Sequence, residues 1–208
     1  MKPLQNTETK DPAGQSGRRK FFQKSLLLTT GVAFFTESSF ASVMKASASG
    51  KSKEEIFSQL DELVDKYFPI FGTCSQTSFY ALNEVFDLKS ENIVKALAPF
   101  PGIAARGETC GSVTGSLLAI ALIYEDNNVF SNKKKLSMSP SVNFCSQFEG
   151  KFGSTRCRDV IAHETKTKYD ITKPGDYKKP EEDGAFEKCP GVIKQAVHFA
   201  AEMILQKS

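Results

Sequence analysis

Apolar residues along most of the chain recur every three or four positions, which is the spacing of amphipathic helices. The first such stretch follows Ser52 and Glu55, which form a capping box, and ends near Phe71-Gly72. Later helices are predicted to begin near residues 73, 90, 139, 154 and 189. No stretch shows the alternation of a half-buried strand. The pattern therefore predicts an all-α domain, a compact bundle of five to seven helices around one central buried helix.

The central helix is expected within Arg106–Tyr124, R-G-E-T-C-G-S-V-T-G-S-L-L-A-I-A-L-I-Y. Thr109 is its predicted N-cap, which places Cys110 at the helix start. The second half is apolar without exception, and a helix that is apolar all round lies inside a core. Gly111 and Gly115 share one face and leave it almost bare, although glycine costs roughly 1 kcal/mol in a helix relative to alanine. They make room either for a close-packed helix or for a cofactor.

Residues 1–48 have the features of an export signal with a polar, disordered beginning. Arg18-Arg19 precedes Phe21-Phe22, an apolar segment follows, and Ala46-Ser47-Ala48 offers a cleavage site. This order resembles a twin-arginine signal, with the basic start of a general secretory signal as the alternative. The sequence predicts export by the twin-arginine machinery to a periplasmic or other extracytoplasmic location, and a helical domain over 49–208.

Removal of this segment changes the charge of the protein. Residues 1–48 hold 7 of the 27 Lys and Arg and 3 of the 24 Asp and Glu, which leaves 20 basic against 21 acidic residues. The mature chain is thus close to neutral, and no nucleic-acid partner is predicted. Its longest apolar run is far short of the ~20 residues that span a bilayer, so no stable membrane span is predicted either.

Cysteines are the candidate chemical groups of the mature chain. Cys74, Cys110, Cys157 and Cys189 fall at or within one turn of a predicted helix start, whereas Cys145 falls inside a helix. A helix start offers unpaired N–H groups and partial positive charge, and both favour the thiolate. If these starts converge, the four thiolates suit an anionic iron–sulfur cluster. The chain has no C-x-x-C, so two disulfides and a thiol redox pair remain open.

Four segments carry a recognisable order of motifs: Cys74 in T-C-S-Q, Cys110–Gly115 as C-G-S-V-T-G, Phe152–Cys157 as F-G-S-T-R-C, and Cys189. Together they resemble the redox-active protein family named for one cysteine, a central motif of cysteine, glycine and alanine with a second glycine, and two later cysteines (C_GCAxxG_C_C). Ser112 stands in place of the alanine. Cys145 lies outside the pattern. The resemblance extends over about residues 60–203, nearly all of the mature chain.

Membership of that family implies redox chemistry. Its pattern is similar to the iron–sulfur region of split-Soret cytochromes c, which implies a two-iron, two-sulfur cluster with Cys74, Cys110, Cys157 and Cys189 as ligands. Gly111 and Gly115 would then lie beside the cluster. No C-x-x-C-H is present for a c-type haem. Twin-arginine export carries folded proteins, which suits a cofactor inserted beforehand. We therefore expect an exported electron-transfer protein with an unidentified redox partner protein.

Two other functions fit the residues. In a thiol–disulfide redox protein, Cys110 would attack and another cysteine, Cys74 in the simplest version, would resolve the mixed disulfide. In a disulfide-stapled binding module, the polar residues 165–187 would form a long exposed loop that binds a partner. His163 and His198, the two histidines of the chain, are interpreted as structural.

Overall fold

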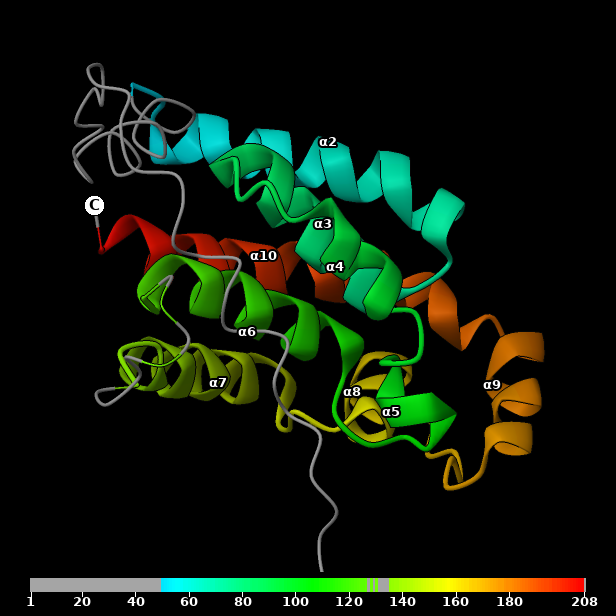
Figure 1. Ribbon diagram of the computed structural model, residues 1–208. Helices are drawn as coiled ribbons and strands as arrows, with labels where there is room; N and C mark the ends of the chain where they lie inside the picture. The colour runs from blue at the N-terminus through cyan, green and yellow to red at the C-terminus, as the bar shows by residue number, and fades with distance from the viewer. Residues whose placement is uncertain (1–49, 127, 129, 131–134, 208) are drawn as a thin grey trace, which may run out of the picture. The chain divides into compact units, whose positions relative to one another are not determined.

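The computed structural model describes residues 50–126, 128, 130 and 135–207. Its α-helices are α2 Lys53–Phe71, α3 Cys74–Phe86, α4 Glu91–Ala96, α5 Gly102–Ala105, α6 Gly111–Tyr124, α7 Met138–Phe152, α8 Cys157–Thr165, α9 Lys178–Glu182 and α10 Cys189–Leu205, with short 3-10 helices Pro174–Tyr177 and Ala185–Lys188 (Figure 1). No strand occurs in the described residues, so the all-α prediction is confirmed. The predicted export signal, 1–48, lies outside them.

Nine α-helices in the described part of the chain exceed the predicted five to seven. The difference comes from α5 and α9, which have only four and five residues. Such single turns carry no helical periodicity that a sequence could display. None of the described helices is long and apolar enough to cross a membrane.

Local signals fix the first helix as predicted. The Ser52 hydroxyl accepts the backbone N–H of Glu55, and the Glu55 carboxylate accepts the N–H of Ser52, which completes the capping box. The helix ends at Phe71 because Gly72 adopts a left-handed conformation, with φ 65°.

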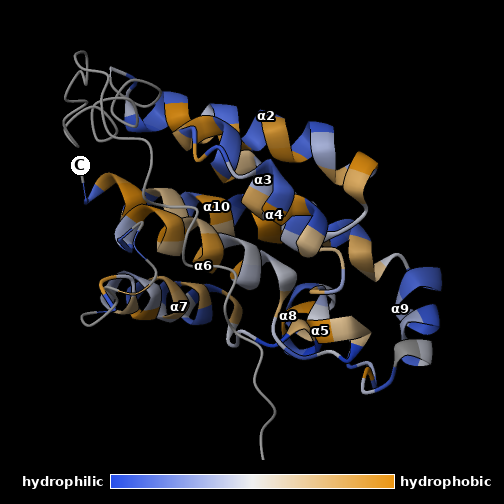
Figure 2. Ribbon diagram, viewed as in Figure 1, coloured by the Kyte–Doolittle hydropathy of each residue, from blue (hydrophilic) through white to orange (hydrophobic). Residues whose placement is uncertain are grey.

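The main hydrophobic core lies between α3, α6 and α10, with α2 and α7 packed on them. Helix α10 contacts α2, α3, α6 and α7, and it buries eight residues. In Figure 2, α6 and α10 show long hydrophobic stretches, whereas α9 is mostly hydrophilic. The largest fully buried side chains include Phe79, Phe144, Phe148, Leu60, Leu82, Ile193 and Met203.

The prediction that α6 is buried all round is right only for its first half. Ser112, Val113 and Ser116 are buried there, but in the second half Leu118 is 36% exposed. The first half is buried because its small residues let α3 approach closely. The best-buried helix of the described residues is α3, in which ten of the 13 residues are buried.

The segment 166–188 is folded, which corrects the expectation of a long exposed loop over 165–187. Ile171 and Ala185 are buried in a second, smaller hydrophobic cluster that also contains Cys157 and Ile161. Tyr169, Tyr177 and Phe186 pack against this cluster. The segment has few apolar residues, and those of the smaller cluster pack on α8 and on one another. Contacts between such distant residues leave no helical periodicity in the sequence.

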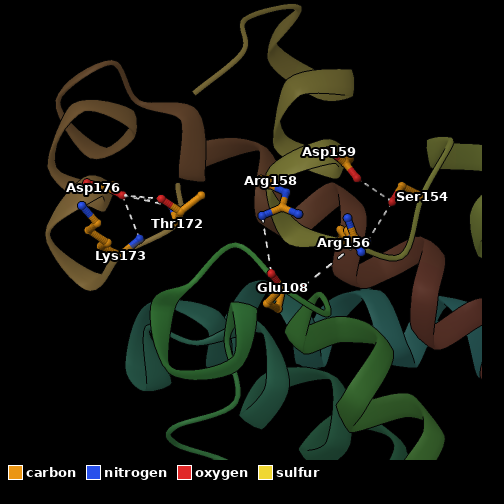
Figure 3. Close-up of polar contacts among 8 residues, drawn as sticks. All are labelled: Glu108, Ser154, Arg156, Arg158, Asp159, Thr172, Lys173 and Asp176. Atoms are coloured by element: carbon orange, nitrogen blue, oxygen red, sulfur yellow. Dashed lines mark hydrogen bonds and ion pairs between the residues drawn. The ribbon is translucent and has the colours of Figure 1, made fainter. Parts of the chain in front are cut away.

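A carboxylate fixes the turn at the middle of this segment. Asp176 accepts the backbone N–H groups of Thr172, at 3.0 Å, and Lys173, at 2.7 Å (Figure 3). These two backbone hydrogen bonds lower the pKa of Asp176. The turn directly precedes Tyr177, so it sets where that side chain lies.

Candidate functional site

The four cysteines of the motif all lie at helix N-termini. Cys74, Cys157 and Cys189 are the first residues of α3, α8 and α10, and Cys110 is the N-cap of α6. Cys145 lies inside α7. All five cysteines are among the described residues and each is a free thiol. The two disulfides considered from the sequence are therefore not present in this structure.

Thr109 does not cap α6, contrary to the sequence prediction. It pairs instead with Arg156 in an isolated antiparallel bridge. The Cys110 N–H donates to Thr155 O at 2.8 Å, and the Cys157 N–H donates to Glu108 O at 2.6 Å. This tertiary pairing holds Thr109 in extended backbone and brings the starts of α6 and α8 together.

Ion pairs surround the same junction. The Glu108 carboxylate lies 3.4 Å from an Arg158 nitrogen and 4.0 Å from Arg156 Nε (Figure 3). Both pairs are partly exposed, and such pairs contribute little to stability. The backbone pairing, not the ion pairs, therefore sets the distance between Cys110 and Cys157.

Close packing of α3 on α6 brings Cys74 to Cys110. A Cβ on Gly111 would lie 2.5 Å from Cys74 Sγ and 2.8 Å from the backbone nitrogen of Ser75. A Cβ on Gly115 would overlap the Ser78 hydroxyl. The two glycines thus make room for α3 and, at Gly111, for the sulfur of Cys74.

Cys110 is the cysteine whose thiolate is most favoured. A hydrogen bond from the Cys74 thiol is the main reason that its pKa falls to about 7. The backbone N–H groups of Ser112 and Val113 add to this effect against the cost of burial. The same hydrogen bond, together with burial, raises the pKa of Cys74 well above its ordinary value.

The other two motif cysteines are disposed toward the protonated form. Burial, followed by the charge of Cys110, raises the pKa of Cys157 to about 12 and also raises that of Cys189. The charge of Cys110 acts on Cys74, Cys157 and Cys189 alike. The four sulfurs therefore lie within electrostatic reach of one another.

A pocket of about 560 Å³ opens beside these sulfurs. Its lining includes Cys74, Cys157, Cys189, Phe68, Pro101, Ala105, Tyr177, Phe186, Glu181 and Glu187. Cys110 is 5% exposed and is not part of the lining. Three of the four cysteines thus line one cavity, and the fourth, Cys110, is hydrogen-bonded to one of them, Cys74.

The segment 166–188 supplies a site residue that sequence reasoning missed. The Tyr177 hydroxyl lies 3.6 Å from Cys157 Sγ, and burial raises the pKa of Tyr177. An isolated tyrosine in a polar stretch gives no local signal of this role.

Both histidines pair with carboxylates and do not line the pocket. His163 Nδ1 lies 2.9 Å from Glu164, and His198 Nε2 lies 2.9 Å from Asp61, with its ring stacked on Phe57. In the part of the chain that is described, no group of three or more His, Cys, Asp or Glu is arranged to hold one metal ion.

The sequence profile of a protein family matches residues 72–203, and the family is described as "Putative redox-active protein (C_GCAxxG_C_C)". The match contains all four helix-start cysteines and covers more than half of the chain. The chain belongs to this family. The label of the C_GCAxxG_C_C family writes the central motif as G-C-A-x-x-G. In this chain residues 110–115 read C-G-S-V-T-G, with Cys110-Gly111-Ser112 at the first three positions. No curated protein and no solved structure matches the chain.

Proposed function

We propose that this member of the C_GCAxxG_C_C family is an electron-transfer protein whose motif cysteines hold a two-iron, two-sulfur cluster. The observation that carries the proposal is that cysteines from four separate helix N-termini lie within electrostatic reach of one another, three of them in the lining of one pocket. The ligands would be Cys74, Cys110, Cys157 and Cys189. A bound cluster of this kind supplies one-electron redox chemistry.

The chemistry of the donors fits such a cluster. Thiolates are its usual ligands, and helix N-termini offer positive potential and N–H groups to an anionic group. Cys110 already shows this effect, because backbone N–H groups of α6 help to lower its pKa. In a two-iron cluster each metal takes only two cysteines. The lack of a site for one metal ion among the described residues is therefore compatible with the proposal.

The exposure of the thiols favours a cluster over thiol exchange with a substrate. A thiol that attacks a disulfide must be both ionised and accessible. Cys110 has the lowered pKa but is buried and does not line the pocket. Cys157 and Cys189 line the pocket, but burial raises their pKa. No motif cysteine combines the two properties.

Anaerobic purification of the full chain tests the proposal. We expect about two iron atoms and two acid-labile sulfides per chain, with a visible absorption spectrum. C157S is expected to lose this cofactor, whereas C145S, which changes a cysteine inside α7, keeps it. A folded wild-type protein that stays colourless and iron-free after reconstitution would overturn the proposal.

A thiol–disulfide function is the second candidate, and the hydrogen bond between Cys74 and Cys110 favours it. Here the Cys110 thiolate attacks a substrate disulfide and releases one substrate thiolate. Cys74 then gives up its proton and attacks the Cys110 sulfur, which leaves a Cys74–Cys110 disulfide and a fully reduced substrate. This candidate predicts that C74S traps a mixed disulfide on Cys110, detectable by mass spectrometry. Slow alkylation of Cys110 in metal-free reduced protein at pH 8 argues against it.

Export is a separate proposal, and it rests on Arg18-Arg19 and the segment that follows. We propose the twin-arginine route because it accepts proteins that have folded around a cofactor. Replacing both arginines by lysine preserves the positive charge but should leave the precursor in the cytoplasm. K24R is the matched control and should be exported normally. Export of the double variant would show a general secretory signal instead.

A further inference from the structure

Tyr177 connects the segment 166–188 to the motif cysteines. It is the last residue of the 3-10 helix Pro174–Tyr177, and its hydroxyl lies 3.6 Å from Cys157 Sγ. Its ring stacks on Phe186 with centroids 5.2 Å apart and an angle of 17° between the planes. The side chain is thus held at the pocket wall against one particular sulfur.

The neighbouring backbone leaves room for this hydroxyl and orients it. A Cβ on Gly102 would overlap the Tyr177 oxygen and would lie 3.5 Å from Cys157 Cβ. The backbone nitrogen of Gly107 lies on the same side of Gly102 as the Tyr177 oxygen, and its N–H lowers the pKa of Tyr177 against the larger effect of burial. An N–H can only donate, so Gly107 does not compete for the tyrosine proton, which remains available for Cys157.

We propose that Tyr177 is a positioning residue that donates a hydrogen bond to the Cys157 sulfur and thereby raises the reduction potential of the centre held by the motif cysteines. The inference rests on the proposed cluster. A metal-bound thiolate has no proton and can only accept, which fixes the direction of the hydrogen bond. Hydrogen bonds to ligand sulfurs stabilise the more negative, reduced state.

The test compares Y177F with wild type in the iron-loaded full chain. Redox titration followed by visible absorption should give a more negative midpoint potential for Y177F, at unchanged iron and sulfide content. Resonance Raman spectra should show a shifted iron–cysteine stretching band. Y169F is the matched control, because Tyr169 lies in the same segment but its hydroxyl donates to Asp183, 3.3 Å away. Its potential should equal that of wild type.

The outcomes separate the two proposals. A wild-type protein without iron and sulfide overturns the cluster, before any variant is compared. A loaded Y177F with the wild-type potential, or an equal shift in Y169F, overturns the role of Tyr177 alone. If Y177F does not fold, D176N provides the second arm, since it weakens the turn that precedes Tyr177. It should shift the potential in the same direction, and an unchanged potential would contradict the inference.

Discussion

Gly111 is the residue at which helix packing and the cysteine site coincide. Its side facing α3 lies against Cys74 Sγ and the backbone of Ser75, so a methyl group there would clash with both. A sequence can show that two glycines share a helix face. It cannot show what approaches that face, because the approaching residues belong to α3, more than thirty positions away.

Replacing Gly111 by alanine should therefore destabilise the protein. Overpacking costs about 1–3 kcal/mol, and the gain of about 1 kcal/mol in helix propensity offsets only part of it. We expect G111A to lower the free energy of unfolding in urea by up to about 2 kcal/mol. G150A is the control, since a Cβ on Gly150 in α7 meets nothing within 4 Å. That variant should be neutral or slightly more stable, and equal losses in both would contradict the packing argument.

At the scale of elements, the junction between α6 and α8 depends on backbone hydrogen bonds. The Glu108 side chain contributes little to the stability of this junction, because its ion pairs with Arg156 and Arg158 are partly exposed. E108Q should change the free energy of unfolding by less than about 1 kcal/mol, as measured by urea denaturation. A larger loss would show that the ion pairs hold the junction.

The segment 166–188 depends on the carboxylate of Asp176. The N–H groups of Thr172 and Lys173 lower the pKa of Asp176 in the folded state. The ionised carboxylate therefore stabilises the turn at pH values above the ordinary pKa of aspartate, about 3.9. This stabilisation is lost as the pH falls through the lowered folded value. NMR should show the amide signals of Thr172 and Lys173 moving in that acidic range. In D176N both should already be displaced at pH 7, whereas D170N, which changes an exposed carboxylate of the same segment, should leave them in place.

The helix starts could be predicted from sequence because their signals are local. The capping box at Ser52 and the placement of Cys74 and Cys157 need only a few neighbouring residues. The prediction of Thr109 as the cap is wrong because its backbone pairs with a distant residue, Arg156, in an antiparallel bridge. The fold of 166–188 and the role of Tyr177 were missed for the same reason, since both depend on contacts between distant parts of the chain.

On the scale of the whole described domain, the motif cysteines belong to different hydrophobic clusters. Cys74 and Cys110 are part of the main core of α3, α6 and α10, whereas Cys157 belongs to the smaller cluster with Ile171. A centre that binds all four cysteines would therefore join the two clusters covalently. Without it, the smaller cluster is held by few buried side chains.

Removal of the proposed iron–sulfur centre should consequently loosen one part of the domain before the other. In hydrogen exchange of the metal-free reduced protein, residues 157–188 should lose protection, because local opening needs least energy where few apolar contacts exist. Helices α3 and α10 should exchange as slowly as in the loaded protein, since aliphatic and aromatic side chains make up most of their core. The C145S variant, measured with and without the iron–sulfur centre, should show the same loss of protection in residues 157–188. Equal loss of protection in both clusters would instead indicate that the centre supports the entire fold, and no difference would indicate that the sulfurs do not join the clusters.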